Sequence, residues 1–101
     1  MRQIHNQGCP LCSCAAEFQF ADYENRKHFR CTNCTEFVIS VRAEERLADS
    51  IPQWRSQYSE MAKKSNEEKI LVITIPSVQK QEGVANPAIQ GEFVLRSTLR
   101  L

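Results

Sequence analysis

The stretches Cys9-Pro10-Leu11-Cys12 and Cys31-Thr32-Asn33-Cys34 contain four of the five cysteines in this chain of 101 residues. Two residues separate the cysteines within each stretch, and 18 residues separate the two stretches. A turn of this length brings two thiolates to one side of a metal ion, so two turns supply a tetrahedral set of ligands. We therefore predict one Zn²⁺ per chain, bound by Cys9, Cys12, Cys31 and Cys34. Buried or redox-active thiols are the alternative, and the paired spacing favours a metal.

Three other side chains are alternative ligands. Cys14 follows Cys12 closely enough to replace it, but two intervening residues are the usual spacing, so we expect Cys14 to be a free thiol. His5 and His28 could also coordinate zinc, but four cysteines already complete its tetrahedral coordination. Iron is the alternative ion, although closed sites of four thiolates are typical of zinc.

The residues between and after the cysteine pairs indicate three strands. Phe18 and Phe20 fall on one face at the period of a strand, and the polar break at 23–26 is typical of a hairpin connection. Residues 27–30 then return the chain to the second cysteine pair. The run Phe37–Val41 is rich in β-branched residues and predicts a third strand.

Two Cys-x2-Cys turns, joined by a two-stranded insert and followed by a strand, resemble the zinc-ribbon family. The resemblance covers residues 8–41. Ser13 and Thr35 stand just after the two cysteine pairs, where the family often has glycine because the turn needs an open backbone. A treble-clef arrangement is the structural alternative, and it requires a helix directly after Cys34, where Phe37–Val41 favours a strand.

The middle of the chain predicts an amphipathic helix, because apolar side chains recur at spacings of three and four residues. The residues of this stripe are Leu47, Ile51, Trp54, Tyr58 and Met61. We expect the stripe to pack in the core. Ser50 and Pro52 favour a short helix over 43–48 followed by the main helix over 51–64. One continuous helix kinked at Pro52 is the alternative.

The last third of the chain predicts two strands separated by a polar loop over 77–91. The apolar run Ile70–Ile75 suits a strand that is covered on both faces. The segment Glu92–Leu101 alternates in the manner of a half-buried strand. The side chains expected on its buried face are Phe93, Leu95, Leu99 and Leu101.

The expected fold class is therefore α+β. Residues 1–42 form a small zinc-ribbon β-unit. Residues 43–101 form an amphipathic helix and a C-terminal β-hairpin or strand pair, and we expect them to pack with the ribbon as one domain.

Composition and charge narrow the function classes. The chain carries 13 Lys and Arg against 12 Asp and Glu, a net charge of +1, so it has no polybasic tail. It has no run of about 18 apolar residues and no apolar leader at its start, so we expect a cytoplasmic protein without a membrane partner. A closed site of four cysteines leaves no position for water or substrate, and no catalytic motif accompanies it, so we expect no enzyme.

Two binding functions are compatible with these features. The first is binding of nucleic acid or a nucleic-acid-associated protein. The zinc-ribbon resemblance implies it, and Arg26, Lys27 and Arg30 support it because cations beside aromatic rings suit phosphate contact and base stacking. The second is a protein-interaction or homo-oligomerisation module, in which the C-terminal strands pair with a second copy as a homodimer. We expect macromolecular binding, with the first function ahead of the second.

Overall fold

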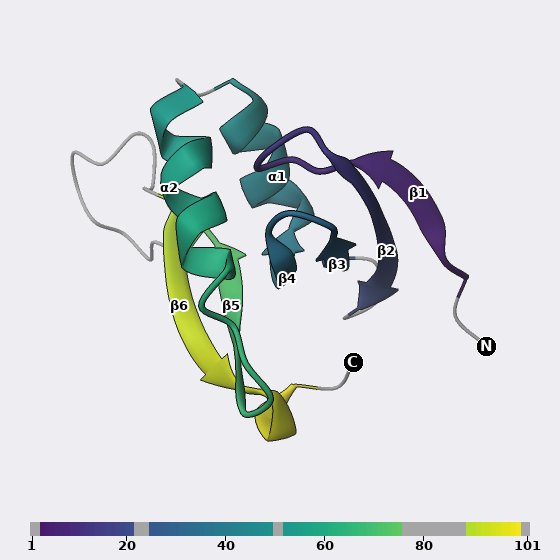
Figure 1. Cartoon of the computed structure of the whole chain (residues 1–101), viewed down its shortest axis with the longest axis vertical. Helices are drawn as coiled ribbons and strands as arrows, with labels where there is room; N and C mark the ends of the chain where they lie inside the picture. The colour runs from purple at the N-terminus through teal and green to yellow at the C-terminus, as the bar shows by residue number, and fades with distance from the viewer. Residues whose placement is uncertain (1–2, 22–24, 50–51, 76–88, 100–101) are drawn as a thin grey trace.

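All strands of the computed structural model join one sheet, whose spatial order follows the chain (Figure 1). The structure describes residues 3–21, 25–49, 52–75 and 89–99. The strands are β1 (His5–Gly8), β2 (Ala15–Ala21), β3 (Arg26–Cys31), β4 (Thr35–Ser40), β5 (Lys69–Thr74) and β6 (Gln90–Leu95). The helices are α1 (Val41–Ala48), α2 (Pro52–Ala62) and the 3-10 helix η1 (Arg96–Thr98). The predicted α+β class, with its C-terminal strand pair, is confirmed.

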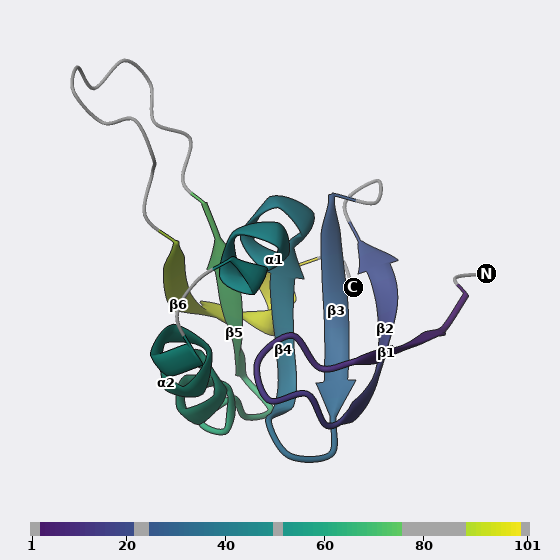
Figure 2. The ribbon, with the colours of Figure 1, turned by 90° about the horizontal axis from the view of Figure 1, so that it is seen from above.

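The sheet is mixed. Strands β1 to β4 form an antiparallel meander, β5 pairs with β4 in parallel, and β6 returns antiparallel to β5. A parallel pair needs a crossover connection, and α1 and α2 provide it between β4 and β5. Both helices pack on β4 and β5 (Figure 2). The Gln7 side chain of β1 also donates a hydrogen bond to the Glu44 carboxylate of α1. Strand β1 was not predicted, because its sequence His5–Gly8 is polar and resembles a loop.

A row of large side chains crosses the sheet on the side that carries the helices, called here the helix face. Phe18, Phe29, Phe37 and Leu71 stand opposite one another on four successive strands, and all are buried. The Phe29 and Phe37 rings stack with their centroids 5.2 Å apart. Leu47 of α1 joins the same core cluster. Because adjacent strands present this row in register, the pairing of β2 to β5 and the burial of the core support each other.

The opposite side of the sheet, the far face, has a smaller apolar cluster of Val38, Ile70 and Val72. The partly buried side chains of Val94 and Leu99 pack against it. Strand β5 is therefore covered on both faces, as its continuous apolar run predicts.

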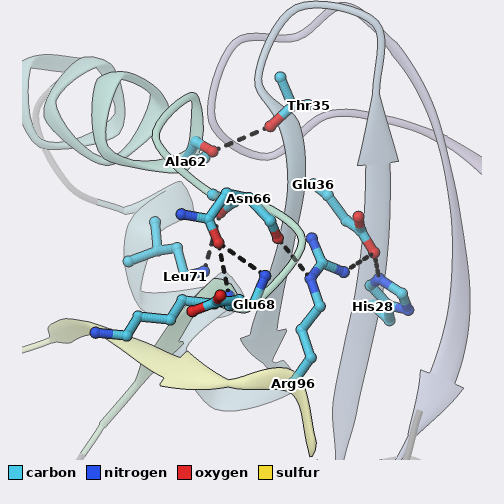
Figure 3. Close-up of polar contacts among 10 residues, drawn as sticks. His28, Thr35, Glu36, Ala62, Asn66, Glu68, Leu71 and Arg96 are labelled. Carbon is cyan, nitrogen blue, oxygen red and sulfur yellow. Dashed lines mark hydrogen bonds and ion pairs between the residues drawn. The ribbon is translucent and has the colours of Figure 1, made fainter.

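A polar network holds the C-terminal segment to the far face (Figure 3). Glu36 of β4 contacts the buried imidazole of His28 and forms an ion pair with Arg96 at 2.9 Å. The Arg96 side chain also donates to the carbonyl oxygen of Asn66 at 2.7 Å. The Asn66 side chain accepts hydrogen bonds from the backbone of Glu68 and Lys69, which shapes the turn before β5.

The helical region corrects one prediction. The break before Pro52 is real, since α1 ends at Ala48 and α2 begins at Pro52. Leu47 and Tyr58 are buried as expected, but the Trp54 side chain is 49% exposed, so its predicted place in the core was wrong. The reason lies within α2, whose buried residues are Tyr58, Ser59 and Ala62. This buried face is rotated to one side of the predicted stripe, so Trp54, in the first turn of the helix, lies at its border.

The C-terminal strand corrects a second prediction. Strand β6 ends at Leu95, and the next three residues form η1 instead of continuing the strand. Phe93 and Leu95 were expected to be buried but are 38% and 45% exposed, because β6 is the edge of the sheet. Val94 and Leu99 make the apolar contacts instead. The predicted features at 23–24, 50–51, 77–88 and Leu101 lie outside the described residues.

Within the described residues, no helix combines the length and the apolar character that crossing a membrane requires.

Candidate metal centre

The four predicted cysteines lie together in the structure. The sulfur atoms of Cys9, Cys12, Cys31 and Cys34 all lie within 4.8 Å of one another. The Sγ atoms of Cys9 and Cys34 are 3.8 Å apart, and those of Cys12 and Cys31 are 3.4 Å apart. Zinc with four bonds of about 2.3 Å in a tetrahedron places its sulfur ligands about 3.8 Å from one another. The observed sulfur separations are therefore close to those of a loaded site.

Two backbone turns present these thiols. Cys9 and Cys12 belong to the turn between β1 and β2, where the Ser13 N–H donates to the Cys9 carbonyl at 2.8 Å. The Leu11 N–H points at the Cys9 sulfur from 3.4 Å. In the second turn, the N–H groups of Asn33 and Cys34 lie 3.4 Å from the Cys31 sulfur. Backbone donors aimed at sulfur stabilise thiolates, which are the form that binds a metal.

Each turn ends in a left-handed residue. Ser13 has a φ of 67° and Thr35 a φ of 74°, both in the region that favours glycine. Both residues directly follow a cysteine pair. The turns therefore adopt a left-handed backbone without glycine, at some cost in backbone strain.

The electrostatics of the cluster favour a bound cation. Burial raises the pKa of the Cys34 thiol to about 12, and burial also raises the pKa of Cys9. Burial opposes ionisation of Cys12 too, but hydrogen bonds from the Cys14 backbone and the Asn33 side chain outweigh it and lower the Cys12 pKa to about 6. Several thiolates crowded in a dry site repel one another unless a cation neutralises them. A divalent ion provides that neutralisation.

Helix α2 contacts the metal centre directly, which no pattern in the sequence indicated. The hydroxyl oxygen of the buried residue Ser59 lies 2.9 Å from the Cys34 sulfur. One turn further along α2, the Ala62 carbonyl accepts a hydrogen bond from the Thr35 hydroxyl at 3.0 Å (Figure 3). The second cysteine turn is therefore attached to the helix by two polar contacts. A serine in a helix has no spacing that marks it in advance.

The alternative ligands lie elsewhere. Cys14 is exposed and outside the group of four, although its carbonyl accepts the Cys9 N–H at 2.8 Å. The His5 ring stacks on Phe18 with centroids 5.0 Å apart. His28 lies on the far face against Glu36. Cys12, rather than Cys14 or a histidine, therefore completes the group.

The three cations predicted to contact nucleic acid do not share one face. The Lys27 ammonium lies on the helix face, 2.8 Å from a Glu44 carboxylate oxygen and 4.5 Å from the Phe18 ring centroid. Arg26 and Arg30 alternate with Lys27 and point to the far face. There Arg30 stands opposite Glu17 on one neighbouring strand and Glu36 on the other. The positive charge of this group is thus divided and partly balanced.

The arrangement as a whole has the chemistry of a structural metal site. Four cysteines can fill a tetrahedral shell, so a bound metal ion would link the two cysteine turns. No family model, curated protein or solved structure matches the chain. The inference of metal binding therefore depends on the sulfur geometry and its surroundings.

Proposed function

We propose that this chain is a non-enzymatic, cytoplasmic zinc-binding protein of the zinc-ribbon type, in which one structural site of four cysteines supports a surface that binds another protein. The observation that carries the proposal is the group of four cysteine sulfurs within 4.8 Å of one another. Reduced thiols of this kind persist in the cytoplasm. Zinc is the ion that closed four-thiolate sites typically hold.

The location of the site supports a structural role. Zinc would join the β1–β2 turn to the β3–β4 turn, and the Ser59 contact would extend the linkage to α2. A chain of 101 residues buries a modest share of its surface, so an added crosslink contributes much of its stability. The end of the crossover that leads into β5 is thereby held to the start of β4.

The C-terminal edge of the sheet supports protein as the partner class. Phe93 and Leu95 on β6 expose large apolar side chains beside a strand edge that is unpaired among the described residues. Edge strands with exposed apolar side chains readily pair with another chain. The alternative surface, the basic residues of β3, is weakened as a binding site by the Lys27–Glu44 ion pair.

Nucleic acid is a second candidate partner, and one observation favours it. Arg30 is exposed and lines an open hollow of about 370 Å³ with Asn6 and Thr32, which can contact phosphate, although the carboxylate of Glu17 lines it too. Replacing Arg26, Lys27 and Arg30 together with Ala tests this candidate. If these cations neutralise phosphates, affinity falls across all sequences and the salt dependence flattens by about 0.7–0.9 in log K per log salt for each phosphate that is no longer neutralised. Absence of binding by the wild-type protein at low salt rules it out.

Measurement of the metal content tests the main proposal. Native mass spectrometry and elemental analysis of protein purified without chelator should show one zinc ion per chain. Protein with no metal, or with less than half an equivalent after zinc is supplied, overturns the proposal. Iron in the same stoichiometry would keep the structural role and change the ion, and the absorption of ferric thiolate distinguishes the two.

A further inference from the structure

The pairing of β6 with β5 determines which β6 residues direct their backbone N–H and C=O groups toward the outer edge of the sheet. The Arg96 N–H donates to the Glu68 carbonyl at 2.8 Å, and these two residues extend the register that pairs Lys69 with Leu95. In an antiparallel pair, the residues that exchange hydrogen bonds alternate along each strand. Val94 and Glu92 therefore exchange hydrogen bonds with β5. The intervening residues Gly91, Phe93 and Leu95 direct their N–H and C=O groups away from β5, toward the outer side of the strand.

The same alternate residues carry the exposed apolar surface. Phe93 and Leu95 are the two exposed large hydrophobic side chains of the strand. At Gly91 a Cβ atom would lie 2.9 Å from the Tyr58 ring, so the β6 backbone there is in close contact with the Tyr58 side chain of α2. Natural edge strands are usually protected by charged side chains, above all lysine, by proline or by a bulge. The sequence of β6 contains neither lysine nor proline, and Glu92 is its one charged residue. The outer edge of β6 can therefore pair with a strand of another chain.

We infer that the partner at this edge is a second copy of the chain, joined by antiparallel β6–β6 pairing about a two-fold axis at Phe93. The inference rests on the proposed protein-binding function and names the partner. In this register, Phe93 stands opposite Phe93 of the second copy, and Gly91 stands opposite Leu95. Each of these pairs exchanges backbone hydrogen bonds, because all three residues direct their polar groups outward. The Leu95 carbonyl also accepts a hydrogen bond from the Thr98 hydroxyl at 2.7 Å, so it uses its second lone pair for the partner.

The position of the charged residue in β6 favours pairing of two copies about an axis at Phe93. Glu92 is the one charged side chain in the strand, and the axis at Phe93 places it opposite the apolar Val94 of the other copy. An axis at Glu92 would instead set two carboxylates directly opposite each other, which is unfavourable. An axis at Val94 would shorten the overlap, because β6 ends at Leu95. The opposite edge of the sheet, β1, has the polar sequence His5–Gly8, which contains no large aliphatic side chain.

The oligomeric state of the zinc-loaded chain tests this inference. Sedimentation equilibrium and native mass spectrometry should show the mass of two chains rather than the 11.6 kDa of one. Phe93→Lys adds a charge at the axis and should shift the protein to the monomer. The matched control is Ile4→Lys, which changes a side chain of 54% exposure near the other edge of the sheet and should leave the dimer intact. A wild-type monomer at all concentrations, or a dimer that dissociates only in Ile4→Lys, overturns the inference.

Amide hydrogen exchange tests the register independently. In the dimer, the N–H groups of Gly91, Phe93 and Leu95 become protected, and this protection should disappear on dilution or in Phe93→Lys. The N–H groups of Glu92 and Val94 bond to β5, so their protection should not depend on concentration. A dimer without this alternation has a different interface and overturns the inference. Zinc content is measured on the same samples, so a failure of the dimer is distinguished from a failure of the metal site.

Discussion

The two ends of the sheet are held together by different chemistry. At one end, the turns at β1–β2 and β3–β4 converge on four cysteines, which adjoin the apolar core through Leu11 and Phe29. At the other, β5 is covered on both faces and the chain end is held by the ion pair of Arg96 with Glu36. The first end depends on an ion from outside, and the second depends on burial and on its own charges. A small chain can thus use a metal to add a crosslink to its apolar core.

The largest expected effect is the removal of a ligand at the metal end. Cys34→Ser removes a buried thiolate that also touches Ser59, and the remaining three ligands hold zinc poorly. Metal binding in small zinc domains contributes about 10–16 kcal/mol at neutral pH, so the cysteine turns should lose their structure. Zinc stoichiometry and amide exchange in β1–β4 measure the result. Retention of one tightly bound zinc by Cys34→Ser would contradict the ligand assignment.

Cys14→Ser is the matched control for that experiment, because it changes the one cysteine outside the group. The variant should bind one zinc ion and unfold at a temperature close to that of the wild type. If Cys14→Ser loses zinc while Cys12→Ser retains it, Cys14 is the ligand and Cys12 is the free thiol.

The metal end is also the part that the sequence predicts best. Ligands two residues apart constrain each other locally, so the spacing of Cys9 and Cys12 indicates their role without any knowledge of the fold. The contact of Ser59 with Cys34 depends on how a helix packs 25 residues away, and no local pattern encodes it. At the other end, the apolar run of β5 indicated a strand covered on both faces. The Arg96–Glu36 pair joins segments that only the tertiary fold brings together.

Breaking the polar network at the C-terminal end should have a moderate effect. Arg96→Ala removes the ion pair with Glu36 and the hydrogen bond to the Asn66 carbonyl. The Arg96 side chain is partly exposed, so solvent screening limits the effect to about 1–2 kcal/mol of unfolding free energy. Urea unfolding of zinc-loaded protein measures it. Arg96→Lys is the control, and it should recover only part of the stability because an ammonium lacks the planar fork of the guanidinium.

The pH dependence of stability should differ between the two ends as well. Burial lowers the pKa of His28 from its usual 6.5, and the opposing effect of Glu36 does not cancel this. As the pH falls below 6.5, the unfolded chain takes up this proton before the folded chain does. The contribution of neutral His28 is therefore complete above the unfolded pKa and is lost as the pH falls through the folded pKa.

Comparison of the wild type with His28→Gln isolates that contribution. Unfolding free energies measured from about pH 7.5 to 5.5 should fall more steeply for the wild type, because glutamine does not titrate. Loss of zinc through protonation of the thiolates affects both proteins, so the difference between their slopes reports His28 alone. Identical slopes would show that His28 titrates alike in the folded and unfolded states.

A small gain in stability is expected at the first cysteine turn. Ser13 has a φ of 67°, which costs a residue with a side chain about 1–2 kcal/mol. Ser13→Gly removes that strain and adds backbone entropy to the unfolded chain, for a net stabilisation of about 0.5–1 kcal/mol. Thermal unfolding of zinc-loaded protein measures it. Ser13→Ala keeps the strained backbone and should show no gain. Thr35 is unsuitable for the same test because its hydroxyl is bonded to Ala62.

The smallest effect is expected at Trp54, where helical periodicity alone predicts a core residue. The side chain is 49% exposed, so Trp54→Ala should change the unfolding free energy by less than about 0.5 kcal/mol. Tyr58, one turn later on α2, is buried and donates to the Ile89 carbonyl at 3.0 Å. Tyr58→Ala should therefore cost about 3 kcal/mol or more. Urea unfolding of both variants measures the contrast. Equal effects would mean that Trp54 packs in the core after all.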